Sequence, residues 1–235
     1  MARTEGAVRL DRDWHQGADG VPYPPEPWYL GGDLLASAFV VPVTELPAGT
    51  LDVVPAGSRP LTIGGSIVVV AAFVHYTEGG VLQYEELLTS FPVLSARHGA
   101  RVSIPHIWVT SPHSRTGGRE LWGIPKHLAE FERSVDGRTV RTAMRIDGAP
   151  VASLTARPGR RILPGTRQVP LPTAQVLDGV RSFSTNRIVG HLRTLRATWE
   201  FAPDGPLGYL AGRRRLGDLA ATEAAVLFGT KVSHD

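Results

Sequence analysis

Short apolar runs separated by turn residues dominate the middle of the chain. The runs are rich in branched and aromatic residues, which is typical of β-strands. We expect strands over Leu34 to Val43, Ile67 to Tyr76, Val81 to Leu88 and Ala100 to Thr110. Glycine and proline residues separate these runs, as at Gly79-Gly80. Because such residues favour turns, the pattern predicts a mainly β fold.

Two Asp-Gly dipeptides, Asp136-Gly137 and Asp147-Gly148, divide the next part of the chain into three further runs. These runs are Leu128 to Val135, Arg138 to Ile146 and Pro150 to Ala156. Asp-Gly between two alternating runs is a strong signal for a tight hairpin turn. The sequence therefore predicts a three-stranded antiparallel meander here.

One segment of the middle region, Ser114 to Gly123, lacks the alternation of a strand and lies just before Pro125. A short helix that ends ahead of the proline is the expected structure.

The last third of the chain repeats the strand pattern less regularly. We expect strands around Arg181 to Ile188, His191 to Phe201 and Ala220 to Phe228. The alanine-rich stretch Leu219 to Val226 also has helical propensity, and its strand-rich neighbours favour the strand.

Residues 1–27 end in a proline-rich segment, Val21 to Pro27, in which four prolines fix the backbone and prevent a helix. We expect an extended N-terminal arm. No linker, repeat or low-complexity tract divides the rest, and all-β domains of this length are commonly single. The expected organisation is one antiparallel β domain over residues 1–235 with a few short helices.

Composition narrows the functional classes. The sequence is 42% hydrophobic and 20% charged, which suits a packed core, and it has no cysteine, which excludes disulfides and thiolate chemistry and favours a cytoplasmic location. The arginines behind the net charge of +3 are scattered, so they do not predict a nucleic-acid partner. The longest apolar run, Ile67 to Val74, is too short to cross a bilayer, so we expect no membrane association.

Lysine is rare in this chain. Of the 25 basic residues only Lys126 and Lys231 are lysines. Unlike arginine, lysine can lose its proton and condense with a carbonyl group, and an apolar environment favours the neutral amine. Lys126 lies in a segment with Arg119, Glu120 and His127, among the apolar residues Leu121, Trp122, Ile124 and Leu128. The alternative is an ordinary solvated lysine whose stem covers apolar neighbours.

Other catalytic and cofactor motifs are absent. The sequence has no glycine-rich dinucleotide or phosphate loop and no nucleophile-elbow motif, and its histidines lack a zinc-binding spacing. We therefore expect no cofactor and no metal.

The segment Gly118 to Lys126 resembles the active-site segment of the acetoacetate decarboxylase family, in which a Pro-Lys step carries a Schiff-base lysine. Pro22 to Gly31 is similar to the family's proline-rich entry to a Trp-x-Leu-x-Gly segment. Tyr84-Glu85-Glu86 is similar to its Tyr-x-Glu strand. The three motifs occur in the family's order over roughly residues 20–156.

The resemblance implies a cone-like or barrel-like antiparallel β fold, a homo-oligomer, and a lysine that faces an enclosed pocket. It implies a lyase that needs no cofactor: Lys126 forms an iminium with acetoacetate or a related β-keto acid, and the iminium accepts the electrons released with CO₂. Glu86 is the expected pocket carboxylate, and a one-residue error in register would exchange it with Glu85. The expected catalytic residues are Lys126, Glu86 and His127, and the expected substrate contacts are Arg119, Glu120, Tyr84, Trp122 and Tyr29.

Two departures from the family pattern keep alternatives open. The chain has Pro125-Lys126-His127 where the family's decarboxylases have Pro-Lys-Lys, and a histidine can act as acid or base near neutral pH. The segment Trp28 to Leu30 has no arginine for a substrate carboxylate. If Tyr29 takes that place, the reaction is an aldolase, dehydratase or cyclase step on a larger keto compound. A non-catalytic β-barrel that binds an apolar small molecule is a further alternative.

Overall fold

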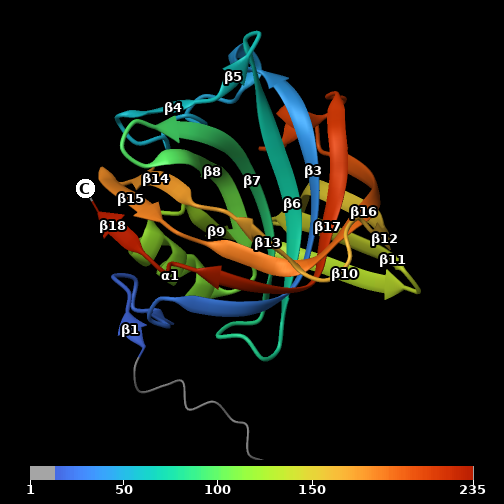
Figure 1. The fold of residues 1–235 in the computed structure, drawn as a ribbon, viewed down its shortest axis with the longest axis horizontal. Helices are drawn as coiled ribbons and strands as arrows, with labels where there is room; N and C mark the ends of the chain where they lie inside the picture. The colour runs from blue at the N-terminus through green and yellow to red at the C-terminus, as the bar shows by residue number, and fades with distance from the viewer. Residues whose placement is uncertain (1–13, 235) are drawn as a thin grey trace, which may run out of the picture.

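The computed structural model describes residues 14–234, and this part of the chain contains eighteen β-strands and one α-helix (Figure 1). The helix is α1 Pro112–Trp122, and two 3-10 turns lie at Val43–Glu45 and Gly208–Leu210. The strands are β1 His15–Gln16, β2 Pro22–Tyr23, β3 Trp28–Pro42, β4 Ser58–Pro60, β5 Thr62–Ile63, β6 Ser66–Thr77, β7 Tyr84–Ser95, β8 Gly99–Val109, β9 Lys126–Leu128, β10 Glu130–Asp136, β11 Thr139–Ile146, β12 Ala149–Arg161, β13 Arg167–Pro170, β14 Thr173–Leu177, β15 Val180–Ser184, β16 Arg187–Phe201, β17 Arg215–Phe228 and β18 Val232–His234. The predicted mainly β fold is confirmed.

Sixteen of these strands form one sheet, whose main path runs β10-β11-β12-β16-β17-β3-β6-β7-β8-β14-β15-β18. Figure 1 shows the sheet curling, so that β7 and β8 lie across from β13 and β16. Strand pairing does not close this path into a barrel within residues 14–234. Most pairs are antiparallel, but β14 and β9 both run parallel to β8, which corrects the expectation of a purely antiparallel sheet. The chain reaches β9 through α1 rather than through a hairpin, and such a crossover permits parallel pairing.

The local predictions agree with most of these elements. The three-stranded meander is β10, β11 and β12, with Asp147 (φ 49°) and Gly148 (φ 76°) in one of its turns. The alanine-rich stretch is part of strand β17, and the predicted helix is α1.

The prediction of one strand over Arg181 to Ile188 is wrong, because the strand is interrupted: β15 ends at Ser184 and β16 begins at Arg187. The Asn186 side chain stabilises this interruption. Its Nδ2 atom donates a hydrogen bond to the Leu171 carbonyl at 3.0 Å, and its Oδ1 atom accepts one from the Gly229 backbone amide at 2.7 Å.

The predicted N-terminal arm falls partly outside the described residues, which begin at Trp14. Its second half, residues 14–27, forms the small hairpin of β1 and β2 and packs on α1. The Asp19 carboxylate accepts a 2.7 Å hydrogen bond from the Thr116 hydroxyl and pairs with Arg115. These contacts hold the segment between β1 and β2 against the helix.

Strand β6 is apolar on both faces. Val69, Ala71 and Phe73 pack into a core with residues of β11, β12 and β16, whereas Val70 and Ala72 line a cavity. Because successive side chains of a strand point to opposite faces, one strand serves both purposes. The continuous apolar run in the sequence thus reflects a strand that separates the core from the cavity.

Candidate active site

The position of Lys126 is determined by helix α1 and by the residues that begin and end this helix. The helix begins after Ser111, whose hydroxyl accepts a hydrogen bond from the Ser114 amide, and it ends at Gly123, which has a left-handed backbone with φ 62°. Both are common helix caps. Pro125 then prevents continuation of the helix, and Lys126 starts strand β9 beside Ile107 of β8.

Two glycines let the helix lie directly on this lysine. A Cβ atom at Gly118 would come within 2.7 Å of the Lys126 Cδ, and one at Gly117 would come within 2.5 Å of the Trp28 ring. Real Cβ atoms do not approach so closely, so either substitution forces a neighbour to move. Gly118 therefore makes room for the aliphatic stem of Lys126.

The Lys126 side chain is 5% exposed, and its ammonium group has three hydrogen-bond acceptors. The Nζ atom lies 2.9 Å from Glu86 Oε2, 2.9 Å from Ser114 Oγ and 3.3 Å from the Tyr84 hydroxyl oxygen. An ammonium group has three N–H donors, so these contacts satisfy all of them. Each N–H of the Lys126 ammonium group therefore has an acceptor, and one of the acceptors is the Glu86 carboxylate.

Two tyrosines complete the polar end of the site. The Tyr76 hydroxyl lies 3.5 Å from Glu86 Oε1, and the rings of Tyr76 and Tyr84 are 4.6 Å apart between centroids. Burial, and secondarily the charge of Glu86, raises the pKa of both phenols well above its usual value. Both hydroxyl groups therefore stay protonated and can donate hydrogen bonds.

The two adjacent glutamates of β7 point to opposite sides of the sheet. Glu86 faces Lys126, whereas Glu85 Oε1 lies 2.5 Å from His75 Nδ1 on the other side. The open question of register is answered in favour of Glu86 as the carboxylate beside the lysine. Its catalytic role stays a prediction.

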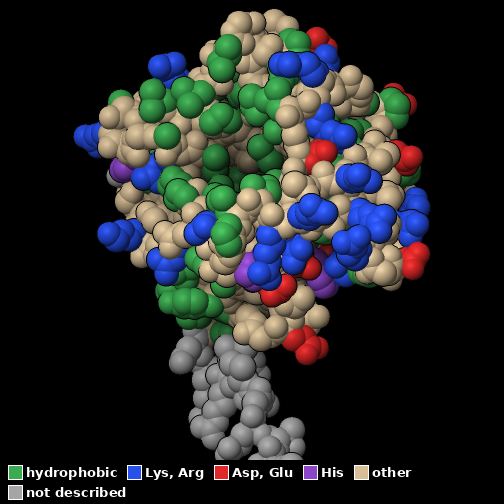
Figure 2. Space-filling model, turned by 45° about the vertical axis from the view of Figure 1, so that its right-hand side comes forward, with side chains coloured by type: hydrophobic (Ala, Val, Ile, Leu, Met, Phe, Trp, Pro, Cys, Tyr) green, Lys and Arg blue, Asp and Glu red, His purple; other side chains and the backbone are tan. Residues whose placement is uncertain are grey.

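The Lys126 and Glu86 side chains lie in the wall of a cavity of about 220 Å³. Most of its other lining residues are apolar and come from β3, β6, β7, β8, β16 and β17. Figure 2 shows a hollow on one face of the molecule with hydrophobic side chains around it, as expected for a cavity with such walls. Among the described lining residues two are cationic, Lys126 and Arg187, and one is anionic, Glu86.

The structure brings together some of the predicted site residues and not others. Tyr84 and Trp122 line the cavity with Lys126 and Glu86. Four other predicted residues do not line it: His127, Arg119, Glu120 and Tyr29.

Alternation along β9 turns His127 away from Lys126, and partial burial, with the charges of Arg119 and Arg115, lowers the pKa of its imidazole. Arg119 faces Asp178 at 3.9 Å, and Glu120 accepts a hydrogen bond from the Ala18 amide. Tyr29 is 64% exposed and lines a separate outer hollow.

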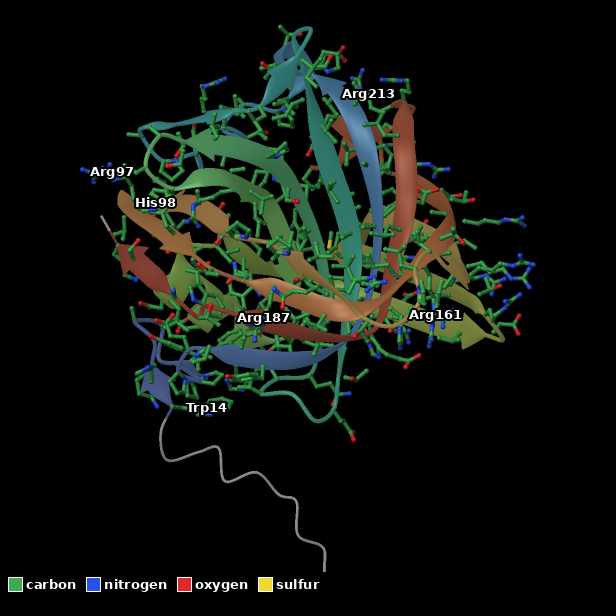
Figure 3. All side chains as sticks on the ribbon, viewed as in Figure 1. Trp14, Arg97, His98, Arg161, Arg187 and Arg213 are labelled. Carbon is green, nitrogen blue, oxygen red and sulfur yellow. The ribbon has the colours of Figure 1, made fainter. Side chains whose placement is uncertain are left out.

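The polar residues that the sequence reasoning missed include Ser114, which contacts Lys126, and Tyr76 and Arg187, which line the cavity. Ser114 lies one helical turn before Gly118, so the helical period places the two on one face and could have revealed it. Tyr76 faces Tyr84 across the β6–β7 hairpin, and only the pairing register shows this. Arg187, labelled in Figure 3, is the first residue of β16 and lines both the cavity and the outer hollow with Tyr29.

No group of metal-ligating side chains suited to a metal ion occurs within residues 14–234. In the same part of the chain, no helix is long and apolar enough to cross a membrane.

The comparisons with known proteins agree with the fold. The family model described as acetoacetate decarboxylase matches residues 36–202, so the chain belongs to the acetoacetate decarboxylase family. No curated protein sequence matches the chain.

Solved structures are similar over nearly the whole chain. The acetoacetate decarboxylase of Legionella pneumophila subsp. pneumophila str. Philadelphia 1 is 18% identical with a TM-score of 0.66, covering 99% of this chain and 98% of that one. An acetoacetate decarboxylase-like enzyme from Sphingomonas wittichii RW1 is 15% identical with a TM-score of 0.63, covering 93% and 96% of the two chains. The enduracididine biosynthesis enzyme MppR, complexed with pyruvate, is 16% identical with a TM-score of 0.62, covering 89% and 90%. At these identities the likeness shows the fold.

Proposed function

We propose that the protein is a carbon–carbon lyase that decarboxylates acetoacetate or a related β-keto acid through an iminium on Lys126. The observation that carries the proposal is the buried Lys126 ammonium, 2.9 Å from the Glu86 carboxylate in the wall of a cavity. A structural ion pair needs no adjoining cavity, whereas a nucleophile needs space for its substrate. Membership of the acetoacetate decarboxylase family supports the same chemistry.

The arrangement supplies each proton that the reaction needs. Transfer of one proton from the ammonium to Glu86 leaves a neutral amine, whose lone pair attacks the ketone carbon. Loss of water from the adduct gives an iminium. The bond to the carboxylate then breaks, its electron pair neutralises the iminium as an enamine, and CO₂ leaves. The protonated Glu86 or a water molecule returns a proton to the enamine carbon, and hydrolysis releases the ketone and the lysine.

Arg187 is the proposed partner of the substrate carboxylate. It is the second cationic residue of the cavity wall. No ion pair is found for it within residues 14–234. A guanidinium matches the two oxygens of a carboxylate. We expect Arg187→Gln to raise the KM for a β-keto acid while borohydride trapping with acetone, which has no carboxylate, stays unchanged. If Arg187→Gln weakened the trapping of acetone as much as it weakened activity on the β-keto acid, this role would be contradicted.

A second candidate is aldol, dehydration or cyclisation chemistry on a larger keto compound. The size of the cavity favours it, because 220 Å³ exceeds the apolar cavity of about 150 Å³ that accommodates benzene. The structural neighbour MppR has been solved with the condensation product of pyruvate and imidazole 4-carboxaldehyde. Both candidates use the same iminium, so CO₂ release separates them.

The test is borohydride trapping in a chain with two lysines. The protein is incubated with acetoacetate, with a panel of keto acids and with acetone, then reduced, digested and analysed by peptide mass. We expect one reduced adduct, on Lys126, and CO₂ release with the productive acids. Lys231→Arg is the matched control because it removes the other lysine, which is exposed, and should leave the adduct unchanged.

Two results would contradict the enzyme proposal. The first is that no carbonyl compound modifies Lys126. The second is that the unaltered protein turns over no keto acid and that Lys126→Ala leaves ligand binding unchanged. The second result would favour the non-catalytic binding protein.

The proposal includes a homo-oligomer in the cytoplasm. Light scattering of the purified protein tests the assembly, since a monomeric mass would contradict it. Fractionation of the source cells tests the location.

A further inference from the structure

The cavity continues along the strands past Glu86, the carboxylate that the Lys126 ammonium contacts. In the sheet, Leu34 of β3, Val74 of β6 and Glu86 of β7 are aligned in one cross-strand row. The next inward-facing row contains Leu219, Ala36, Ala72 and Leu88. Val70 and Ser90 follow in the row beyond it. The lining therefore extends from Glu86 to Ser90, which is about 13 Å along β7.

This extension is an apolar chamber, which we define by six of its lining residues: Ala36, Val70, Ala72, Leu88, Val102 and Leu219. Two adjacent alanines, Ala36 on β3 and Ala72 on β6, leave open space where the neighbouring positions of the row hold leucines. The Glu86 carboxylate lies between this chamber and the part of the cavity lined by Trp28, Leu30 and Phe228. None of the six chamber residues is charged.

The electrostatics restrict what can occupy the chamber. A carboxylate or ammonium placed there would lose its hydration without gaining a partner, which is strongly unfavourable. An uncharged apolar group would instead exchange water for alkyl and aromatic contacts. Acetoacetate has only a methyl group on this side of its ketone, so it leaves the chamber without an apolar occupant.

We infer that the substrate is a keto compound whose carbonyl carries an uncharged apolar group, an alkyl chain or an aromatic ring, that fills the chamber while the carbonyl reaches Lys126. This inference rests on the proposed iminium chemistry and adds the class of substrate. Each additional buried methylene is expected to raise kcat/KM about fourfold until the chamber is full.

The first experiment compares a series of acids that differ only in this group. Decarboxylation rates, corrected for the spontaneous reaction, are measured for acetoacetate, β-ketohexanoate, β-ketooctanoate and benzoylacetate. We expect kcat/KM to rise at least tenfold from acetoacetate to the best of the longer acids. A preference for acetoacetate over all of them would overturn the inference and leave the iminium proposal standing.

Two variants test the chamber directly. Ala72→Leu fills it, so the ratio of kcat/KM for the longer acids to kcat/KM for acetoacetate should fall by tenfold or more. Leu219→Ala enlarges it and should move the optimum to a longer chain. Thr198→Leu is the control, because this exposed β16 residue points away from the interior.

The readouts separate the inference from the proposal on which it rests. Trapping of acetone on Lys126 in Ala72→Leu shows that the reactive end is intact. If Ala72→Leu and Thr198→Leu give the same chain-length profile, the chamber does not select the substrate. If Ala72→Leu does not fold, the acid series and Leu219→Ala decide the question. If no compound modifies Lys126 in the unaltered protein, the proposed function and the inference both fail.

Discussion

Strand β7 carries two neighbouring glutamates, and each is paired with a basic residue on a different side of the sheet. Glu85 lies 2.5 Å from His75, and their side chains are 20% and 26% exposed. Glu86 lies 2.9 Å from Lys126, and their side chains are 4% and 5% exposed. The distances are similar, but the solvent around the two pairs differs.

This difference in burial gives the two pairs different consequences. Water competes for the partly exposed pair, which contributes about 0 to 1 kcal/mol to stability. Loss of one partner from a buried pair leaves an uncompensated charge and costs about 3 to 5 kcal/mol. The inner pair also adjoins a cavity, so a proton exchanged between its members can be used on a ligand. Burial beside a cavity, rather than pairing alone, distinguishes the pair that we propose to be reactive.

The largest effect on activity is expected when the Lys126 amine is removed. Lys126→Met should lower kcat/KM about a thousandfold or more and abolish borohydride trapping, because the other lysine, Lys231, is exposed and does not line the cavity. Lys126→Arg keeps the positive charge but should fail in the same way, since guanidinium does not form the imine. Peptide mass analysis after reduction checks both variants. An adduct elsewhere with activity retained would show that another group is the nucleophile.

The next effect separates the two glutamates. Glu86→Gln should slow imine formation about a hundredfold, because it removes the proton acceptor. It should also lower the free energy of unfolding by about 3 to 5 kcal/mol, because Lys126 is left unpaired. Glu85→Gln is the matched control and should cost about 1 kcal/mol or less. Trapping rates and urea denaturation measure both, and equal effects at the two positions would contradict the comparison.

A smaller effect is expected from moving the lysine without changing its chemistry. In Gly118→Ala the new methyl group meets the stem of Lys126, so imine formation should slow about tenfold. The unfolding free energy should change by about 1 kcal/mol or less, since alanine favours the helix. Gly117→Ala is the comparison, because its methyl group meets Trp28 instead. It should mainly lower stability, and the reverse pattern would show that Gly118 does not position the lysine.

The smallest effect is expected at the outer histidine. His75→Gln should leave kcat/KM unchanged within about twofold and lower the unfolding free energy by about 1 kcal/mol or less. A large loss of activity would show that the outer pair influences the cavity through the sheet.

The sequence predicted those features that depend on local pattern. The Asp-Gly hairpins, the helix before Pro125 and the strands of the middle region follow from turn chemistry and periodicity. Lys126 was found because lysine is rare in this chain. The break at Asn186 was missed because its side-chain bonds reach Leu171 and Gly229, which are distant in sequence.

The prediction of the site residues was limited in the same way, because contacts between residues distant in sequence could not be seen. Arg119, Glu120 and His127 were chosen for their nearness to Lys126 in sequence, but the helical period and the strand alternation turn them away from the cavity. Ser114 and Tyr76 come close to the site only through the packing of α1 and the pairing of β6 with β7. Sequence proximity is therefore a poor guide to a site assembled from four elements.

The double role of β6 has a consequence for how this protein can evolve. Its odd-numbered central residues, such as Ala71 and Phe73, hold the core together, while the even-numbered Val70 and Ala72 contact the contents of the cavity. Mutations at alternate positions of one strand thus address separate properties, one set acting on folding and the other on ligand choice. New substrate preferences can be acquired by changing every second residue, without rebuilding the scaffold.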